Sequence, residues 1–327
     1  MTTTPKSHEK SSLPRLDIVV PCFNEEAALV ETERELLRIL QELVNGGEIG
    51  QTSRLVFVDD GSRDRTWQTI CQCAAKSPSV AGVRLSGNRG HQNALLAGIG
   101  FSDADAVLTI DADLQDDVNV IPAMVRELRA GCDLVYGVRR RRDTDTVFKR
   151  SSARLYYSML RAMGVSVVPD HADFRLMSRT AIDRLMRYSE VNLFLRGIVT
   201  LTGHKSAEVY YDRRARVAGE TKYPLRRMLA LALDGITSFS AVPLRAIALL
   251  GLLVFLLSLG LTGWVLWTRL FTTEAIPGWA SSVIPIYFLG GFQLLSIGVV
   301  GEYVAKIYLE TKARPRYFIE ETVGSSS

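Results

Sequence analysis

Cysteine is scarce in this chain, and its placement excludes two common kinds of site. The 327 residues include four cysteines, Cys22, Cys71, Cys73 and Cys132. Their spacings match neither the paired ligands of a zinc site nor a redox-active pair. We therefore expect ordinary reduced thiols in a domain that faces the cytosol.

Two sequence signals are also missing. The first 15 residues, MTTTPKSHEKSSLPR, lack the apolar core of a signal peptide, and we expect them to form a disordered leader. The Gly-x-Gly-x-x-Gly pattern of dinucleotide-binding folds does not follow the first expected strand, 16–22. That absence argues against a nicotinamide or flavin cofactor.

Long apolar runs, by contrast, are present in the last third of the chain. The runs 246–267 and 283–301 carry no charge, and about 20 apolar residues suffice to span a bilayer. Trp264, Trp267 and Trp279 flank them, as is common at membrane interfaces. We predict two membrane-spanning helices, at about 246–268 and 283–304. A pair of buried core helices is the alternative.

Charged residues around these runs predict their orientation. Basic side chains flank the pair on both outer sides: Arg226, Arg227, Arg245, Lys306, Lys312, Arg314 and Arg316. The positive-inside rule then places both termini in the cytoplasm, with the protein in the plasma (inner) membrane and 311–327 as a basic cytosolic tail. Apolar residues recur at helical spacing within 221–244, which predicts an interfacial amphipathic helix, with a plain core helix as the alternative.

Strand and helix patterns alternate in the domain that precedes these segments, 16–220. Short apolar strands are expected at 16–22, 55–58, 82–85, 106–110 and 133–138. Helices are expected at 25–43, 64–75, 91–101 and 118–129. Repeated β-α units predict an α/β fold, with a mostly parallel sheet covered on both faces.

Polar residues follow the expected strands, at the carboxyl ends where open α/β sheets bind their ligands. Asp111 and Asp113 come directly after the strand 106–110, and in extended geometry their side chains would share a face. Two carboxylates so close are unfavourable alone and favourable around Mg²⁺ or Mn²⁺, which prefer oxygen ligands. Asp116 and Asp117 are expected in the first turn of the next helix, where the helix dipole favours acidic residues.

The densest basic stretch follows the last of these strands, and it consists of Arg139, Arg140, Arg141, Arg142, Lys149, Arg150 and Arg154. Arginine binds phosphate bidentately, so the stretch is a candidate phosphate-binding site. A solvated loop, or a general attraction to anionic lipid headgroups, is the alternative. Nucleic acid, the other partner of such runs, does not fit a chain tethered to a membrane.

Five motifs in order carry a resemblance to a known family: VVPCFNEE, VDDGSRDRT, NRGHQNAL, DADLQDD and DFRLMSR. The chain resembles the inverting family 2 glycosyltransferases, whose GT-A fold is a Rossmann-like mixed, mostly parallel sheet. Two spans after a domain of this size resemble the polyprenyl-phosphate glycosyltransferases, the group of the bactoprenol glucosyltransferases and of dolichyl-phosphate mannose synthase. The resemblance covers about residues 16–316, and it specifies the reaction class better than the sugar.

The resemblance implies roles for individual residues. The nucleotide sugar is expected to contact Pro21, Asn24, Glu25, Asp59, Asp60, Asn88, Gly90, Asp111, Ala112 and Asp113. Asp111 and Asp113 are expected to hold Mg²⁺ or Mn²⁺, and the expected catalytic residues are Asp113, Gln115 and Asp173. Asp173 matches an acidic position near the acceptor, as an orienting group or a base; Asp170 is its rival, and a structural pair with Arg175 is the alternative. The lipid phosphate is expected to bind Arg139, Lys149, Arg150, Arg154, Arg175 and Lys222.

The implied reaction transfers a hexose from a nucleotide sugar to a lipid phosphate. UDP-glucose and undecaprenyl phosphate are the expected substrates, GDP-mannose is the alternative donor, and the resemblance suggests a homo-oligomer, with four subunits. A processive polysaccharide synthase fits less well, because those enzymes carry Gln-x-x-Arg-Trp and no tryptophan here follows an arginine. A membrane-anchored nucleotide-sugar binding or scaffold protein is the alternative without catalysis.

Overall fold

The computed structural model describes residues 13–140, 171–190, 195–202, 205–212 and 279–324, together with single residues and short runs between 244 and 271. It divides into two compact units, each of which is described by itself. The first consists of Met1–Tyr157, Ser166–Lys222 and Pro315–Ser327, and the second consists of Ser158–Val165 and Tyr223–Arg314.

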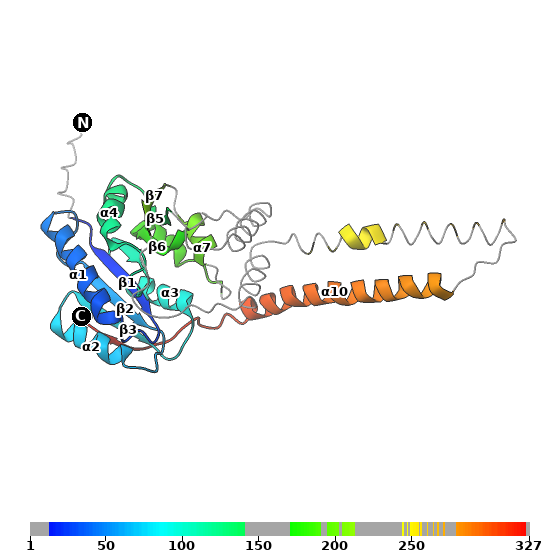
Figure 1. Cartoon of the computed structure of the whole chain (residues 1–327), viewed down its shortest axis with the longest axis horizontal. Helices are drawn as coiled ribbons and strands as arrows, with labels where there is room; N and C mark the ends of the chain where they lie inside the picture. The colour runs from blue at the N-terminus through cyan, green and yellow to red at the C-terminus, as the bar shows by residue number, and fades with distance from the viewer. Residues whose placement is uncertain are drawn as a thin grey trace, which may run out of the picture. The chain divides into compact units, whose positions relative to one another are not determined.

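One mixed sheet forms the centre of the first unit (Figure 1). Its order is β7-β5-β6-β4-β1-β2-β3-β8. The strands are β1 Leu16–Cys22, β2 Arg54–Asp59, β3 Val80–Leu85, β4 Ala106–Thr109, β5 Leu134–Arg139, β6 His171–Ser178, β7 Ser206–Tyr211 and β8 Ile319–Val323. Parallel pairs join β1 to β2 and β4, β2 to β3, and β5 to β7. The antiparallel pairs join β6 to β4 and β5, and β8 to β3. The predicted α/β class with a mostly parallel sheet is confirmed.

Helices cover both faces of this sheet. They are α1 Leu29–Asn45, α2 Thr66–Lys76, α3 His91–Phe101, α4 Ile121–Arg129, α6 Arg179–Leu185 and α7 Leu195–Ile198, with 3-10 turns η1 Val118–Val120 and η2 Val199–Leu201. Successive side chains of a strand point to opposite faces, and all of β1 is buried. Ile18 and Val20 belong to the core cluster under α1, α2 and α4. On the other face α3 comes so close that a Cβ on Gly98 would lie 2.4 Å from Val19 Cγ1.

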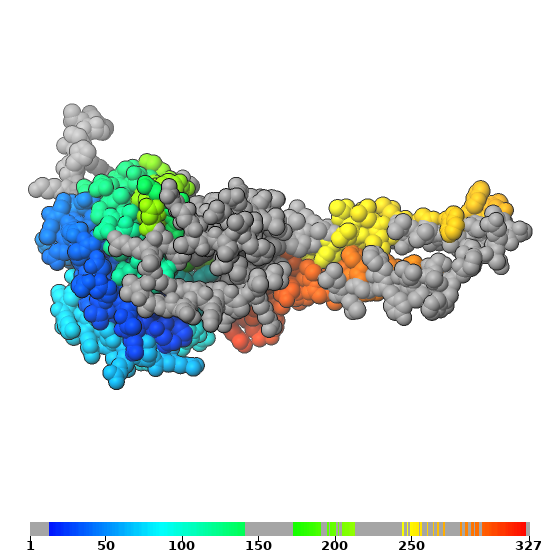
Figure 2. All heavy atoms as spheres, viewed as in Figure 1, coloured from blue at the N-terminus to red at the C-terminus, as the bar shows by residue number. Residues whose placement is uncertain are grey.

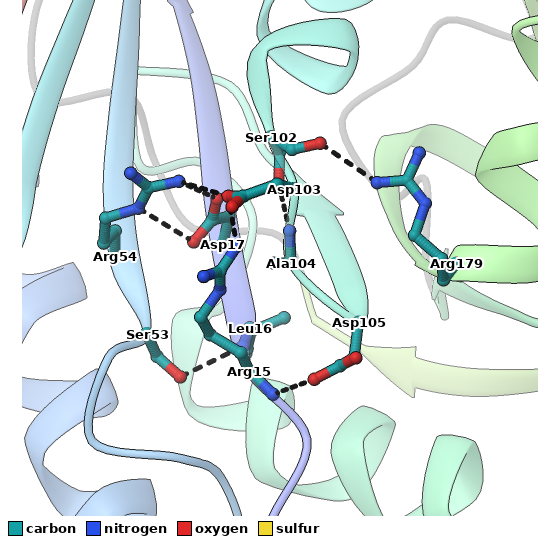
Figure 3. A network of polar contacts seen from close by, with 10 residues as sticks. All are labelled: Arg15, Leu16, Asp17, Ser53, Arg54, Ser102, Asp103, Ala104, Asp105 and Arg179. Atoms are coloured by element: carbon teal, nitrogen blue, oxygen red, sulfur yellow. Dashed lines mark hydrogen bonds and ion pairs between the residues drawn. The ribbon is translucent and has the colours of Figure 1, made fainter. Parts of the chain in front are cut away.

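The amino ends of the central strands are closed by a polar network, drawn in Figure 3. Asp17, in β1, is fully buried and accepts hydrogen bonds from Arg54 Nη2 at 2.8 Å and Ser102 Oγ at 2.7 Å. Arg54 also reaches Asp103 at 3.1 Å, and Arg15 pairs with the same carboxylate. The network ties β1 and β2 to the segment between α3 and β4, at the end of the sheet opposite the polar loops.

Three strands of the sheet were not foreseen from the sequence. β6 inserts antiparallel between β4 and β5, so the fourth and fifth expected strands are not neighbours. β7 adds an edge beside β5. Residues 311–327, expected as a basic tail, instead contribute β8, which covers the backbone edge of β3 that would otherwise stay open. Trp67 Nε1 donates to Glu321 Oε2 at 3.0 Å and helps to hold β8 in place.

In the second unit, the long helix α10 Trp279–Thr311 has 33 residues. Its exposed apolar side chains include Ile286, Ile297, Val300, Val304 and Ile307. The described residues of this helix are drawn in orange in Figure 2. Within the part of the chain that the structure describes, no helix is both long enough and apolar enough to cross a membrane. The predicted spans are therefore not confirmed. About half of the first span, 246–268, and nearly all of the predicted amphipathic helix, 221–244, lie outside the described residues.

Candidate active site

The loops after β1 and β2 are held together by hydrogen bonds from backbone N–H groups to side-chain oxygens. Asn24, with φ 55°, donates its backbone N–H to Ser62 Oγ at 2.9 Å, and its Oδ1 accepts from Arg63 N at 2.9 Å. Glu25 N donates to Thr66 Oγ1 at 2.9 Å. Both loops thereby stand together beyond the carboxyl ends of their strands, as predicted. Pro21, which was predicted to contact the nucleotide sugar, is buried within β1 opposite Val58.

The second loop is tied in turn to the loop that precedes α3. Asp60 Oδ1 accepts from Arg89 N at 2.7 Å, and Oδ2 accepts from Gly90 N at 2.8 Å. Burial raises the pKa of Asp60, while the two backbone amides act against that rise. Gly61, at φ +68°, is required here because a Cβ would lie 2.6 Å from Gly87 C. Asp60 therefore joins the loop after β2 to the loop after β3. We call the loops at the carboxyl ends of the strands the rim, and Asn88 is exposed on it.

Asp59 is fully buried at the end of β2. Its Oδ1 accepts from Ser62 N at 3.0 Å. Its Oδ2 accepts no hydrogen bond within the described residues, and Arg84 Nε lies 3.7 Å from it. A buried carboxylate oxygen without a hydrogen bond is costly, so this atom is suited to a donor group from a ligand.

The two aspartates of the predicted metal site lie in a turn rather than in an extended strand. β4 ends at Thr109, and Leu114 has φ 50°, so the expectation that Asp111 and Asp113 share a face of a strand is wrong. The side chain of Asp111 is 37% exposed, but its Oδ1 is buried and accepts no hydrogen bond within the described residues. Burial raises the pKa of Asp111 to about 6, and neighbouring carboxylates add to the rise. Asp113 Oδ1 accepts from Gln115 N at 3.2 Å.

Asp173 reaches the same place from β6. His91, the first residue of α3, lies between the two carboxylates: its Nε2 is 3.5 Å from Asp111 Oδ1 and 3.2 Å from Asp173 Oδ2. Asp173 Oδ1 accepts from Arg175 Nη2 at 3.0 Å. The fold thus brings together the predicted metal-binding and acceptor-side carboxylates, which are 62 positions apart (173 − 111) in the sequence.

A buried ion pair lies behind this turn. Asp116 Oδ1 accepts from Arg139 Nη2 at 2.8 Å and from the Tyr211 hydroxyl. Asp116 was expected in the first turn of the next helix, but η1 begins only at Val118. Asp116 is instead buried, and Arg139 at the end of β5 and Tyr211 at the end of β7 supply its partners. Burial, followed by the charge of Asp116, raises the pKa of Tyr211. Asp117, by contrast, caps η1 by accepting from Asn119 N, close to the prediction.

The predicted phosphate-binding residues fall into two groups. Arg139 and Arg175 are described, and each is paired with a carboxylate inside the protein; Arg175 is fully buried. Lys149, Arg150, Arg154 and Lys222 lie outside the described residues, as does Asp170, the rival of Asp173. The structure therefore leaves the predicted phosphate-binding site a prediction.

The chain is similar in sequence to known proteins. Residues 17–186 match the family described as glycosyl transferase family 2. The chain belongs to that family. The uncharacterized glycosyltransferase YkoT of Bacillus subtilis (strain 168) is 48% identical over 95% of this glycosyltransferase and 93% of its own length. The bactoprenol glucosyl transferase of Shigella phage SfX is 38% identical over 94% of the chain and 99% of its own length. The solved structure of glucosyl-3-phosphoglycerate synthase from Mycobacterium tuberculosis, at 20% identity, covers 69% of this chain and 79% of its own, with a TM-score of 0.45.

The residues of the glycosyltransferase fit a divalent ion that is shared with a substrate. In the described residues no group of three or more metal-ligating side chains is placed to hold an ion alone. Mg²⁺ is commonly bound by one or two carboxylates plus substrate phosphates. Asp111 and Asp113 supply such a pair, and the buried Oδ1 of Asp111, which accepts no hydrogen bond there, fits a cation.

Sequence reasoning missed three residues of this glycosyltransferase site. His91 was given no role, although its motif, NRGHQNAL, is one of the five that carry the family resemblance. Thr32 and Tyr211 carry no local signal, because their partners are 80 and 95 residues away in the chain. Only the fold brings them to the aspartates.

Proposed function

We propose that this glycosyltransferase moves glucose from UDP-glucose to the phosphate of undecaprenyl phosphate, with inversion at the sugar. One observation carries the proposal: His91 joins Asp111, on the donor side, to Asp173, on the acceptor side, within 3.5 Å of both. The choice of substrates is supported by the 38% identity with the phage bactoprenol glucosyl transferase over nearly the whole of both chains.

The donor half of the mechanism depends on the loops that Asp60 and Asn24 hold in place. The nucleotide would lie over these loops, with Asp59 Oδ2 available to a hydrogen-bond donor of the ligand. Asp111 and Asp113 would hold Mg²⁺ or Mn²⁺. The ion would neutralise charge on the departing nucleoside diphosphate.

The acceptor half does not require an obligatory base. A phosphate monoester has a second pKa of about 6, so it is largely ionised at neutral pH and is already a nucleophile. Arg175 and His91 fix the carboxylate of Asp173 from two sides. Asp173 therefore acts as a group that orients the reactants, with proton transfer as a lesser role.

The acceptor is a membrane lipid, so the proposal includes a membrane site. We infer two spans at about 246–268 and 283–304 from their uncharged apolar runs. The catalytic unit and both termini would face the cytoplasm at the plasma membrane, and Lys149, Arg150, Arg154 and Lys222 would meet the lipid phosphate. The homo-oligomer suggested by the family resemblance belongs to the same proposal.

Transfer to lipid tests the reaction. The full-length protein is purified and incubated with undecaprenyl phosphate, Mg²⁺ or Mn²⁺, and radiolabelled UDP-glucose or GDP-mannose. We expect label in the lipid extract from UDP-glucose. Asp113→Asn should lower turnover on the order of 10²- to 10³-fold by weakening electrostatic stabilisation of the leaving group. Asp117→Asn is the matched control, because asparagine still caps η1.

Each outcome separates the alternatives. Label from GDP-mannose alone would change the donor and keep the reaction. No lipid-soluble label from either nucleotide sugar, with the protein folded, would contradict the transfer and favour a binding or scaffold role. Full turnover by Asp113→Asn would remove the proposed metal ligand from the mechanism.

A further inference from the structure

The turn that carries Asp111 and Asp113 is anchored from outside at two points. We call residues 111–116 the aspartate turn. Its backbone is sharply bent, with Leu114 in the left-handed region at φ 50°. A non-glycine residue in that region costs free energy and persists only where the surroundings impose it. The anchors therefore decide where the two carboxylates stand.

The first anchor is Thr32, in the first turn of α1. Thr32 is fully buried, and its Oγ1 lies 2.7 Å from Ala112 O, the carbonyl between the two aspartates. The same hydroxyl lies 2.9 Å from Ala28 O in its own helix. Thr32 contacts neither aspartate side chain in any of the hydrogen bonds described, so it reaches them only through the backbone that joins them.

The second anchor is the buried Asp116–Arg139–Tyr211 network. Arg139 donates to Asp116 Oδ1 from Nη2 at 2.8 Å and from Nε at 3.2 Å. The Tyr211 hydroxyl donates to the same oxygen. The Tyr211 ring packs edge-on against the ring of Phe174, with 5.5 Å between the two ring centroids. Arg139 and Tyr211 lie at the ends of β5 and β7. The end of the aspartate turn at Asp116 is therefore attached to the strands near the β7 edge of the sheet.

We propose that Thr32 and the Asp116–Arg139–Tyr211 network are positioning residues that preset the aspartate turn for a divalent ion and a nucleoside diphosphate. The inference rests on the proposed function of the site. Preorganised ligands need no rearrangement when the ion and the diphosphate arrive, so binding and turnover both benefit from them. The network also gives Arg139 a role inside the protein rather than on the lipid phosphate.

The two smallest changes at Thr32 test the first anchor. Thr32→Val keeps the shape of the side chain and removes the hydroxyl, whereas Thr32→Ser keeps the hydroxyl and removes a methyl group. Binding of Mn²⁺ in the presence of UDP is measured directly by electron paramagnetic resonance and titration calorimetry, without the acceptor. We expect Thr32→Val to weaken Mn²⁺ binding on the order of 10- to 100-fold, as loss of an outer-shell partner does, and Thr32→Ser to stay close to wild type.

Tyr211→Phe tests the second anchor and keeps the test open if Thr32→Val fails to fold. It removes the hydroxyl that donates to Asp116 and keeps the ring against Phe174. We expect weaker Mn²⁺ binding and lower turnover of the folded protein, in addition to any fall in melting temperature that the loss of a buried hydrogen bond causes. A merely structural role would lower the melting temperature and leave Mn²⁺ affinity unchanged.

The outcomes separate this inference from the proposed function. If wild type binds Mn²⁺ and UDP, and Thr32→Val and Tyr211→Phe bind them equally well, the positioning role is overturned and the donor site stands. If wild type binds no UDP with Mn²⁺, the proposed donor site is overturned and the inference with it.

Discussion

His91 Nε2 lies 3.2 Å from Asp173 Oδ2 and 3.5 Å from Asp111 Oδ1. His91 is the first residue of α3, and Gly90 before it has φ +89°. The bend at Gly90 and the start of the helix together fix the position of the imidazole ring. Two carboxylates that face each other raise each other's pKa, and a polar ring between them reduces that repulsion. His91 therefore links the carboxylate that we propose as a metal ligand to the carboxylate that we propose faces the acceptor.

Replacing His91 should impair turnover more than stability. Because His91 contacts a proposed metal ligand, we expect His91→Ala to lower kcat on the order of 10- to 100-fold. The side chain is 43% exposed, so the melting temperature should change little. His91→Lys, which places a cationic group between the same two carboxylates, should recover part of the activity. Initial rates of lipid glycosylation and thermal unfolding of both variants provide the check; an unchanged kcat in His91→Ala would contradict the link.

The sequence was sufficient to predict the central strands and the rim that they share. Each of the five expected strands appears, because short apolar β-branched runs separated by helices allow few other arrangements. The neighbours of those strands were not predictable. β6 follows β5 by a long segment and pairs antiparallel between β4 and β5, which local propensity does not encode.

The partners of buried charges were beyond sequence reasoning for the same reason. Asp116 stands in an acidic run before a helix, a pattern typical of an exposed first turn. Its partners Arg139 and Tyr211 are 23 and 95 residues away, so only the folded sheet reveals that it is buried. β8 was hard to predict for another reason. Four of its five residues are exposed, and its sequence, IEETV, does not alternate apolar and polar residues as a half-buried strand does.

The polar network at the amino ends of the strands should contribute to the free energy of unfolding and not to catalysis. Asp17 is fully buried against Arg54, and removing one partner of a buried ion pair costs about 3–5 kcal/mol. We therefore expect Asp17→Asn to lower the free energy of unfolding by about that amount. Asp103→Asn is the control, because its side chain is 75% exposed and such pairs contribute about 0–1 kcal/mol. Urea unfolding measures both; equal losses would refute the distinction.

Cys73 should be an unusually unreactive thiol. Burial, together with Glu33, whose Oε2 accepts from the thiol at 3.1 Å, raises the pKa of Cys73 to about 12. A raised pKa means less thiolate at a given pH, and the thiolate is the reactive form. In a Cys71→Ser background, we expect Glu33→Gln to shift the pH dependence of Cys73 alkylation to lower pH, measured by mass spectrometry. A curve that does not move would show that access, rather than charge, limits the reaction.

The C-terminal strand β8 depends on a glycine that no other residue replaces easily. Gly324, which follows β8, has φ +68°, and a Cβ there would lie 2.2 Å from Val80 O in the neighbouring strand β3. Gly47 has nearly the same conformation, φ +65°, but a Cβ there would meet nothing within 4 Å. An alanine in the left-handed region costs about 1–2 kcal/mol, so Gly47→Ala should lose only that. Gly324→Ala should lose more, because the backbone of β8 must also move away from β3. Unfolding free energies, with hydrogen exchange at β3 and β8, measure the difference; equal losses without faster exchange at β8 would show that the close approach is not required.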